Sequence, residues 1–206
     1  MAAFTDDFTG TNGENLGDRT GWTLANGTAF AAEVNATNQL KASANEAGFT
    51  AQDTSNANHY AQAVMRYTQT GGPGTTRHFP LAVRVTDSNN FGAAYRSQNG
   101  NEEVYSRSSG TFALLSSASS VVTSGDTIKL EANGTGASSI KVYRNGAELT
   151  GLTTTSAINT TVTTPGMVPR SDAADPWIDD WESDEVSAGG GGTPYYSGMS
   201  LMGVGV

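Results

Sequence analysis

The sequence predicts an all-β fold, and three observations support this prediction. Short segments in which apolar and polar residues alternate recur along most of the chain, as in strands with one buried face. Turn-forming pairs such as Asn-Gly, Ser-Gly and Gly-Asp separate these segments at about ten-residue spacing, which is typical of a sandwich or barrel. No long stretch shows the 3.6-residue period of an amphipathic helix. The 206 residues suit one such domain, which at this length needs no disulfide or metal to fold.

The alternation assigns side chains to the two faces of each expected strand. Within residues 59–69 the alternation separates two sets: one face carries Tyr60, Gln62, Val64, Arg66 and Thr68, and the other carries Ala61, Ala63, Met65 and Tyr67. Within residues 79–86 one face carries four apolar side chains, namely Phe79, Leu81, Val83 and Val85. The segments 127–134 and 138–146 alternate in the same way, and the second ends in Asn145-Gly146, a strong hairpin signal. Further strands are expected at residues 90–97, 102–108 and 111–117.

The composition changes after Val186. Residues 187–192 read SAGGGG, which is a flexible linker by composition. The segment 193–206 has no charged side chain, and its large residues are Tyr195, Tyr196, Met199, Leu201 and Met202. We therefore predict a sandwich domain at residues 1–186 and an extended C-terminal tail at 187–206. We expect the tail to dock on its own sandwich or on a neighbouring subunit, the alternative being a disordered end.

Charge and composition exclude several classes of partner and site. The formal net charge is -9, and the 11 Lys and Arg residues form no basic cluster, so nucleic acid and anionic membranes are not expected partners. The chain has no cysteine, which excludes thiol catalysis and Cys-zinc sites. The first residues lack a basic region followed by an apolar run, and we expect no secretory signal and synthesis in the cytoplasm.

Four segments resemble a known family. They are an opening strand and loop (4–23, FTDDF…GWT), a strand pair joined by DSNN (82–97), a strand pair ending in an NG hairpin (125–149), and a Pro-Gly turn before a closing IDDW strand (163–185). This order is similar to that of concanavalin A-like lectin and glucanase (laminin-G-like) jelly rolls, especially those of tailed-phage structural proteins. The resemblance covers roughly residues 3–186. It implies a jelly-roll sandwich of two antiparallel sheets with the first and last strands adjacent.

The resemblance also bears on catalysis. Glycosidases of that superfamily carry a Glu-x-Asp-x-x-Glu strand, and the aligned residues here contain Asp179 and Glu182 but have Trp177 in place of the first Glu, the nucleophile. A retaining mechanism needs two carboxyl groups, and tryptophan cannot attack an anomeric carbon. We therefore expect no catalytic residues and no enzyme activity. His59 and His78 are isolated, and we expect solvated histidines at strand ends.

Two candidate binding sites follow from the implied fold. Adjacent terminal strands would bring together two aspartate pairs, Asp6 with Asp7 and Asp179 with Asp180, whose oxygens suit a structural calcium. The alternative is a solvated acidic sheet edge, and no other cofactor is expected. Sugar sites in this family use exposed aromatic residues on a concave face. The candidates here are Tyr60, Tyr95, Tyr105 and Tyr143. The alternative for these tyrosines is core or cross-strand packing.

Two functions stay open at this point. The first is a non-enzymatic phage virion protein, a head decoration or cement subunit or a head- or tail-associated component. It would be located in the virion and would dock through its tail and sandwich edge. Its partners would be capsid or tail proteins and further copies of itself. The alternative is a carbohydrate-binding, lectin-like module or adhesin, and a decoration protein could also contact host surface glycans.

Overall fold

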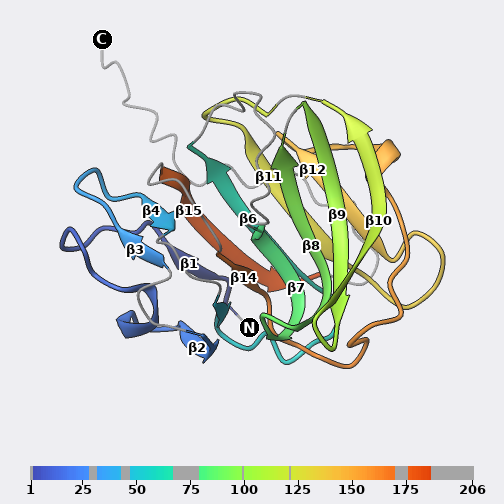
Figure 1. The fold of residues 1–206 in the computed structure, drawn as a ribbon, viewed down its shortest axis with the longest axis horizontal. Coiled ribbons are helices and arrows are strands. Elements are labelled where there is room, and N and C mark those ends of the chain that lie inside the picture. Colours follow the sequence, from blue (N-terminus) through green and yellow to red (C-terminus); the bar gives the residue numbers. More distant parts are fainter. Residues whose placement is uncertain are drawn as a thin grey trace, which may run out of the picture.

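The computed structural model is a sandwich of two antiparallel β-sheets (Figure 1). It describes residues 2–27, 32–42, 47–66, 79–98, 100–120, 122–169 and 176–186. Within this part of the chain the helical elements are short 3-10 turns, among them η1 (Leu16–Asp18) and η3 (Thr150–Leu152). None of the described helices is long and apolar enough to cross a membrane. The predicted all-β fold with two antiparallel sheets is confirmed, whereas the predicted tail at 187–206 lies outside the described residues.

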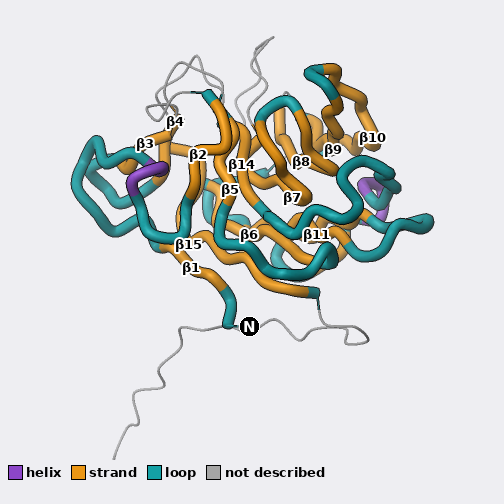
Figure 2. The backbone as a smooth tube through the Cα atoms, turned by 90° about the horizontal axis from the view of Figure 1, so that it is seen from below, coloured by secondary structure: helices purple, strands orange, loops and turns teal. Residues whose placement is uncertain are grey.

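Sheet A contains, in spatial order, β13 (Ala147–Glu148), β12 (Ile140–Arg144), β11 (Thr127–Ala132), β6 (His59–Met65), β15 (Pro176–Glu185), β4 (Leu40–Ala42) and β3 (Ala32–Val34). A further strand, β1 (Phe4–Asp6), pairs with the second half of β15. Sheet B contains β10 (Thr111–Ser119), β9 (Asn101–Ser108), β8 (Asn90–Gln98), β7 (Phe79–Asp87), β14 (Gly166–Val168), β5 (Gly48–Thr50) and β2 (Thr23–Asn26). Figure 2 shows the two sheets as separate layers.

The expected adjacency of the first and last strands is confirmed. Strand β1 runs antiparallel to β15, with Phe4 opposite Ser183 and Asp6 opposite Trp181. Strand β15 lies between β1 and β6, so the last strand of the sandwich occupies a central position in sheet A.

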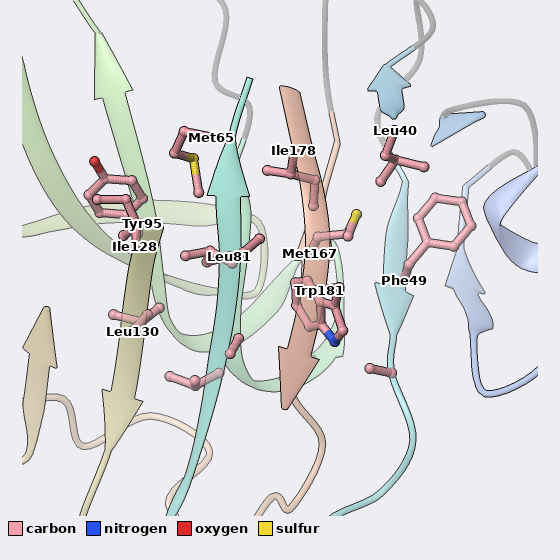
Figure 3. Packing of buried hydrophobic residues seen from close by; sticks show 14 of the residues in the cluster. Leu40, Phe49, Met65, Leu81, Tyr95, Ile128, Leu130, Met167, Ile178 and Trp181 are labelled. Atoms are coloured by element: carbon pink, nitrogen blue, oxygen red, sulfur yellow. The ribbon is translucent and has the colours of Figure 1, made fainter. Parts of the chain in front are cut away.

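The main core lies between the two sheets. Inward-facing side chains from both layers interdigitate there, as in other sandwiches, and Figure 3 shows Leu81, Ile128 and Ile178 among them. A second apolar cluster lies on the outer face of sheet B. It consists of Phe79, Ala82, Val85, Phe91, Ala94 and Val168, with Tyr105 and Phe112 packed against it.

The prediction that Phe79, Leu81, Val83 and Val85 share one face is wrong. Leu81 and Val83 face the main core, whereas Phe79 and Val85 belong to the second cluster. Two backbone irregularities break the alternation. Pairing with β14 shifts between Phe79 and Ala82 of β7, and Arg84 adopts a positive φ of 57°. Each irregularity reverses the side to which the following residues point.

His59 is fully buried, so the expected solvated position is wrong. Its Nδ1 lies 2.9 Å from the carbonyl oxygen of Asn56, and the backbone N–H of Arg84 donates to its Nε2 at 3.0 Å. Nε2 therefore acts as an acceptor, and the ring proton lies on Nδ1. Burial lowers the pKa of His59 to about 4. The hydrogen bond with the Asn56 carbonyl opposes this shift in pKa, the charge of Arg84 adds to it, and Asp53 opposes it slightly.

This burial predicts a loss of stability in mild acid. The pKa of His59 falls on folding from 6.5 to about 4, so the unfolded chain binds the proton more tightly. The contribution of His59 is complete above pH 6.5 and declines as the pH falls toward 4, by about 3 kcal/mol in total. Urea unfolding of the wild type and of His59→Gln between pH 7.5 and pH 4.5 checks this. The variant should show a smaller decline, and equal pH dependences would contradict the prediction.

Candidate functional site

The outer face of sheet A gathers two of the predicted tyrosines. Strand alternation directs Tyr60 and Gln62 of β6, Lys129 and Glu131 of β11, Tyr143 of β12 and Glu182 of β15 away from the core; we call these six residues the tyrosine face. They are neighbours across the strands. Lys129 is opposite Gln62 on one side and opposite Tyr143 on the other, and Glu131 is opposite Tyr60.

A lysine lies between the two tyrosine rings. The Lys129 ammonium is 4.1 Å from the centroid of the Tyr143 ring and 5.4 Å from that of the Tyr60 ring. It also forms an ion pair with Glu131 at 3.0 Å. The cation–π contacts and the ion pair hold the side chain of Lys129 in place. Since Lys129 contacts both rings, the two aromatic side chains belong to one connected surface rather than to separate positions.

Both tyrosines keep their hydroxyl protons at neutral pH. Burial and the hydrogen bond to Glu182 raise the pKa of Tyr60, whose hydroxyl donates to Glu182 Oε1. Burial and the neighbouring Glu131 and Glu148 raise the pKa of Tyr143 to about 12. Neutral hydroxyl groups can donate hydrogen bonds, which phenolate groups cannot.

Some polar groups of this face remain available to a ligand. Within the described part of the chain, neither the Tyr143 hydroxyl nor the Gln62 amide makes a hydrogen bond, and both side chains are only partly buried. The face therefore combines aromatic rings with a free amide and carboxylate groups. Rings pack against apolar C–H groups, while amides and carboxylates exchange hydrogen bonds with hydroxyl groups. Such a surface suits a polyhydroxylated ligand.

The other two predicted tyrosines lie elsewhere. Tyr95 is fully buried between the sheets, as Figure 3 shows, so its ring does not contact a ligand at the surface, and it leaves the set of glycan candidates. Tyr105 lies on the outer face of sheet B, where its ring contacts Phe79 and the guanidinium of Arg96 at 4.9 Å. The structure thus brings together Tyr60 and Tyr143 and separates them from Tyr95 and Tyr105.

Four residues of the tyrosine face are not among the ligand contacts predicted from the sequence: Gln62, Lys129, Glu131 and Glu182. The signal that could have found them is the alternation itself, which places Gln62 on the face of Tyr60 and Lys129 on the face of Glu131. The alternation does not reveal the order of the strands. Strands β6 and β11 are far apart in sequence and become neighbours only in the folded sheet.

Of the four aspartates predicted for calcium, Asp6, Asp7 and Asp179 accept hydrogen bonds from nitrogen donors, and Asp180 Oδ2 lies 3.9 Å from Arg66 Nη2. Asp6 accepts hydrogen bonds from Arg19 Nε at 2.8 Å and from Trp22 Nε1 at 2.9 Å. Asp179 accepts from Arg66 Nε at 3.1 Å, and Asp7 accepts from the backbone N–H of Thr9 at 3.0 Å.

The charges around these aspartates disfavour a cation. Arg19 and Arg66 already neutralise Asp6 and Asp179, and their guanidinium groups would repel a bound calcium ion. Among the residues that the structure describes, no group of three or more His, Cys, Asp or Glu side chains could hold a metal. These residues therefore fit a calcium ion poorly. Asp6 and Asp179 are largely buried against arginine side chains, so the alternative of a solvated acidic edge does not describe them either. Asp180 itself is exposed and stands at a bulge in β15.

The predicted partner-binding residues Tyr195, Tyr196, Met199, Leu201 and Met202 lie outside the described residues, so tail docking stays a prediction. Asp179 and Glu182, which matched part of the glycosidase pattern, bind Arg66 and Tyr60 respectively. The expectation that the chain is not an enzyme also stays a prediction.

Comparisons with known proteins show similarity at the level of fold. No protein-family model and no curated protein matches the sequence. Solved structures do match. Carbohydrate-binding module CBM66 from Bacillus subtilis has a TM-score of 0.50 and 14% identity, covering 82% of this chain and 94% of that one. The cellulose-induced protein Cip1 has a TM-score of 0.51 and 13% identity, covering 89% and 97%.

A third structure shares the sandwich over part of its length. The GH43 protein BlXynB from Bacillus licheniformis has a TM-score of 0.55 and 9% identity, and the match covers 89% of this chain but 39% of that protein. All three similarities concern architecture, since the identities are low. The chain therefore shares its two-sheet fold with domains found in carbohydrate-binding and GH43 proteins.

Proposed function

We propose that this chain binds carbohydrate through the tyrosine face of sheet A. The observation that carries the proposal is the joint placement of Tyr60 and Tyr143 around Lys129, with Gln62 opposite Lys129 on the neighbouring strand. Two rings on a sheet surface offer packing area to the apolar faces of sugar rings. The amide and carboxylate groups beside them offer partners to the sugar hydroxyls.

The similar structures support the same class of ligand. CBM66 is by its name a carbohydrate-binding module, and Cip1 is a cellulose-induced protein. Fold alone does not determine function, so the support they give is secondary to that of the tyrosine face. The adjacency of β1 and β15 also agrees with the concanavalin A-like type of sandwich that the sequence resembles.

The charge of the face favours neutral glycans over acidic ones. Glu131 and Glu182 belong to the face, Asp184 lies two residues after Glu182 on β15, and Glu148 lies on β13 beside β12. The whole chain carries a net charge of -9. A uronic or sialic acid would be repelled by these carboxylates. A glycan array that compares neutral with acidic polysaccharides tests this. Selective retention of acidic glycans would contradict the proposed site.

Tyr143→Ala is expected to weaken glycan binding about tenfold, because it removes one ring and the available hydroxyl group. Tyr143→Phe keeps the ring and should retain most of the affinity. Isothermal titration with a glycan selected from the array measures both variants. Tyr105→Ala makes the same change on the outer face of sheet B and serves as the control, with thermal unfolding to verify that each variant is folded. Equal losses for Tyr143→Ala and Tyr105→Ala would overturn the assignment.

The virion role inferred from the sequence resemblance stays a prediction. It depends mainly on the tail at 187–206, which lies outside the described residues. Deleting the tail and measuring assembly with capsid or tail proteins would test it. A glycan-binding decoration protein would satisfy both proposals.

A further inference from the structure

Strand β10 ends sheet B and is much longer than the other edge strands. It spans nine residues, Thr111–Ser119. The other strands at the ends of the two sheets have four residues (β2), three residues (β3) and two residues (β13). A long edge strand exposes a row of unpaired backbone N–H and C=O groups, and short strands limit that exposure.

The sequence of β10 also lacks the usual protection of an edge. The strand reads TFALLSSAS, with no charged residue and no proline. Leu114, in this strand, is 53% exposed and is the large hydrophobic residue that stands out as exposed among those described. Edge strands of monomeric proteins commonly carry a lysine, a proline or an inward-pointing charge that blocks pairing. None of these is present in β10.

Part of the free side of β10 is covered by the chain itself. Ser116 Oγ donates to the carbonyl oxygen of Leu152 in η3 at 2.9 Å. Thr154 Oγ1 donates to the carbonyl oxygen of Leu115 at 3.3 Å, next to the bulge where pairing with β9 shifts. These contacts involve Leu115 and Ser116, whereas Leu114, at the end of the first half of the strand, is exposed.

We propose that the first half of β10 pairs with β10 of a second copy of the chain. The two strands run antiparallel about a twofold axis near Ala113, which joins the two B sheets into one continuous sheet. In this register Phe112 of one copy lies opposite Leu114 of the other. Both side chains project from the outer face of sheet B, where Phe112 packs against the second apolar cluster. Two apolar cross-strand pairs then form, and each covers the exposed Leu114.

Charge favours a second copy at this edge in particular. Two molecules of net charge -9 repel each other over most of their surfaces. The segment from Ser108 to Gly125 contains no charged residue, so contact here brings no carboxylate of one copy against a carboxylate of the other within this segment.

The first test is the oligomeric state in sedimentation velocity over a range of concentrations. We expect a dimer for the wild type and a dissociation constant at least about tenfold higher for Leu114→Lys, which places two like charges at the interface. Thr23→Lys makes a similar change on β2, the opposite edge of the same sheet, and should leave the dimer intact. A monomeric wild type would overturn the proposal, and β10 would then be a candidate for pairing with a strand of a different protein. A dimer that is unaffected by Leu114→Lys would also overturn it, because the interface would then lie elsewhere.

A second test reads the register directly. The chain has no cysteine, so a single introduced thiol can form only intermolecular disulfides. Ala113→Cys places two thiols opposite each other at the axis, where Cα atoms of an antiparallel pair lie about 4.5–5.5 Å apart, within disulfide range. Mild oxidation should give a cross-linked dimer. Ser117→Cys, in the same strand, would lie opposite Ser109 of the other copy and should cross-link poorly. Equal cross-linking of both variants would contradict this register.

Discussion

Replacing Asp6 with alanine is expected to lower the free energy of unfolding by about 3–5 kcal/mol. Asp6 is 9% exposed, and its carboxylate accepts four hydrogen bonds. Two come from Arg19, one from the indole N–H of Trp22 and one from the backbone N–H of Phe8. Its removal leaves the guanidinium of Arg19 without its main counter-ion, and it leaves the buried indole donor without an acceptor.

Asp7 provides a matched control one residue away. Its carboxylate is exposed on the same strand end and accepts one backbone hydrogen bond from Thr9. Asp7→Ala should change the stability by less than about 1 kcal/mol. Guanidinium unfolding of both variants at pH 7 measures the difference. Similar losses for the two substitutions would show that the Asp6 network does not hold β1 onto the sandwich.

Replacing Trp181 with alanine is expected to cost about 3–5 kcal/mol. Trp181 is 1% exposed and is among the largest fully buried side chains. Its ring meets that of Trp22 edge to face at 4.9 Å, and the ring of Phe4 also meets Trp22 edge to face, at 5.9 Å. The substitution would leave a cavity where β1 and β15 meet, because the neighbouring strands can close only part of it.

Trp181→Phe keeps an aromatic ring in the core, so it should lose less than half of the stability that Trp181→Ala loses. Thermal unfolding followed by near-ultraviolet circular dichroism measures both the stability and the environment of the tryptophans. If Trp181→Ala unfolds at the wild-type temperature, the packing between Trp22 and Trp181 is not what fixes the closing strand.

The sequence predicted the faces of regular strands well and failed at bulges. In β6 and β12 the alternation placed Tyr60 and Tyr143 correctly, because neither strand contains an irregularity. In β15, Ile178 and Trp181 both face the core although they are three residues apart. The bulge at Asp180, where φ is 49°, turns the side chain of Trp181 back toward the core. Nothing in the local sequence requires a bulge at this position. Burial against the opposite sheet selects it instead.

Only part of the candidate site could be predicted from the sequence, for a similar reason. Residue type and alternation were enough to nominate tyrosines, but the separation of Tyr95 from the others depends on which side of sheet B meets sheet A. His59 shows the same limit, because its burial depends on Arg84 of β7, whose backbone donates to the imidazole ring. Contacts between strands that are distant in sequence decide these positions.

The pairing of β1 with β15 has a mechanical consequence. Phe4 lies opposite Ser183, so the outer ends of the two strands meet at the same end of the antiparallel ladder. A force that pulls the two ends of the sandwich apart would load these hydrogen bonds one after another, starting from Phe4, rather than all at once in shear. Strands β1 and β15 would separate pair by pair under tension, until the separation reaches Asp6 and its contacts with Arg19 and Trp22. That cluster would bear the load after the pairs at Phe4 and Thr5 have separated.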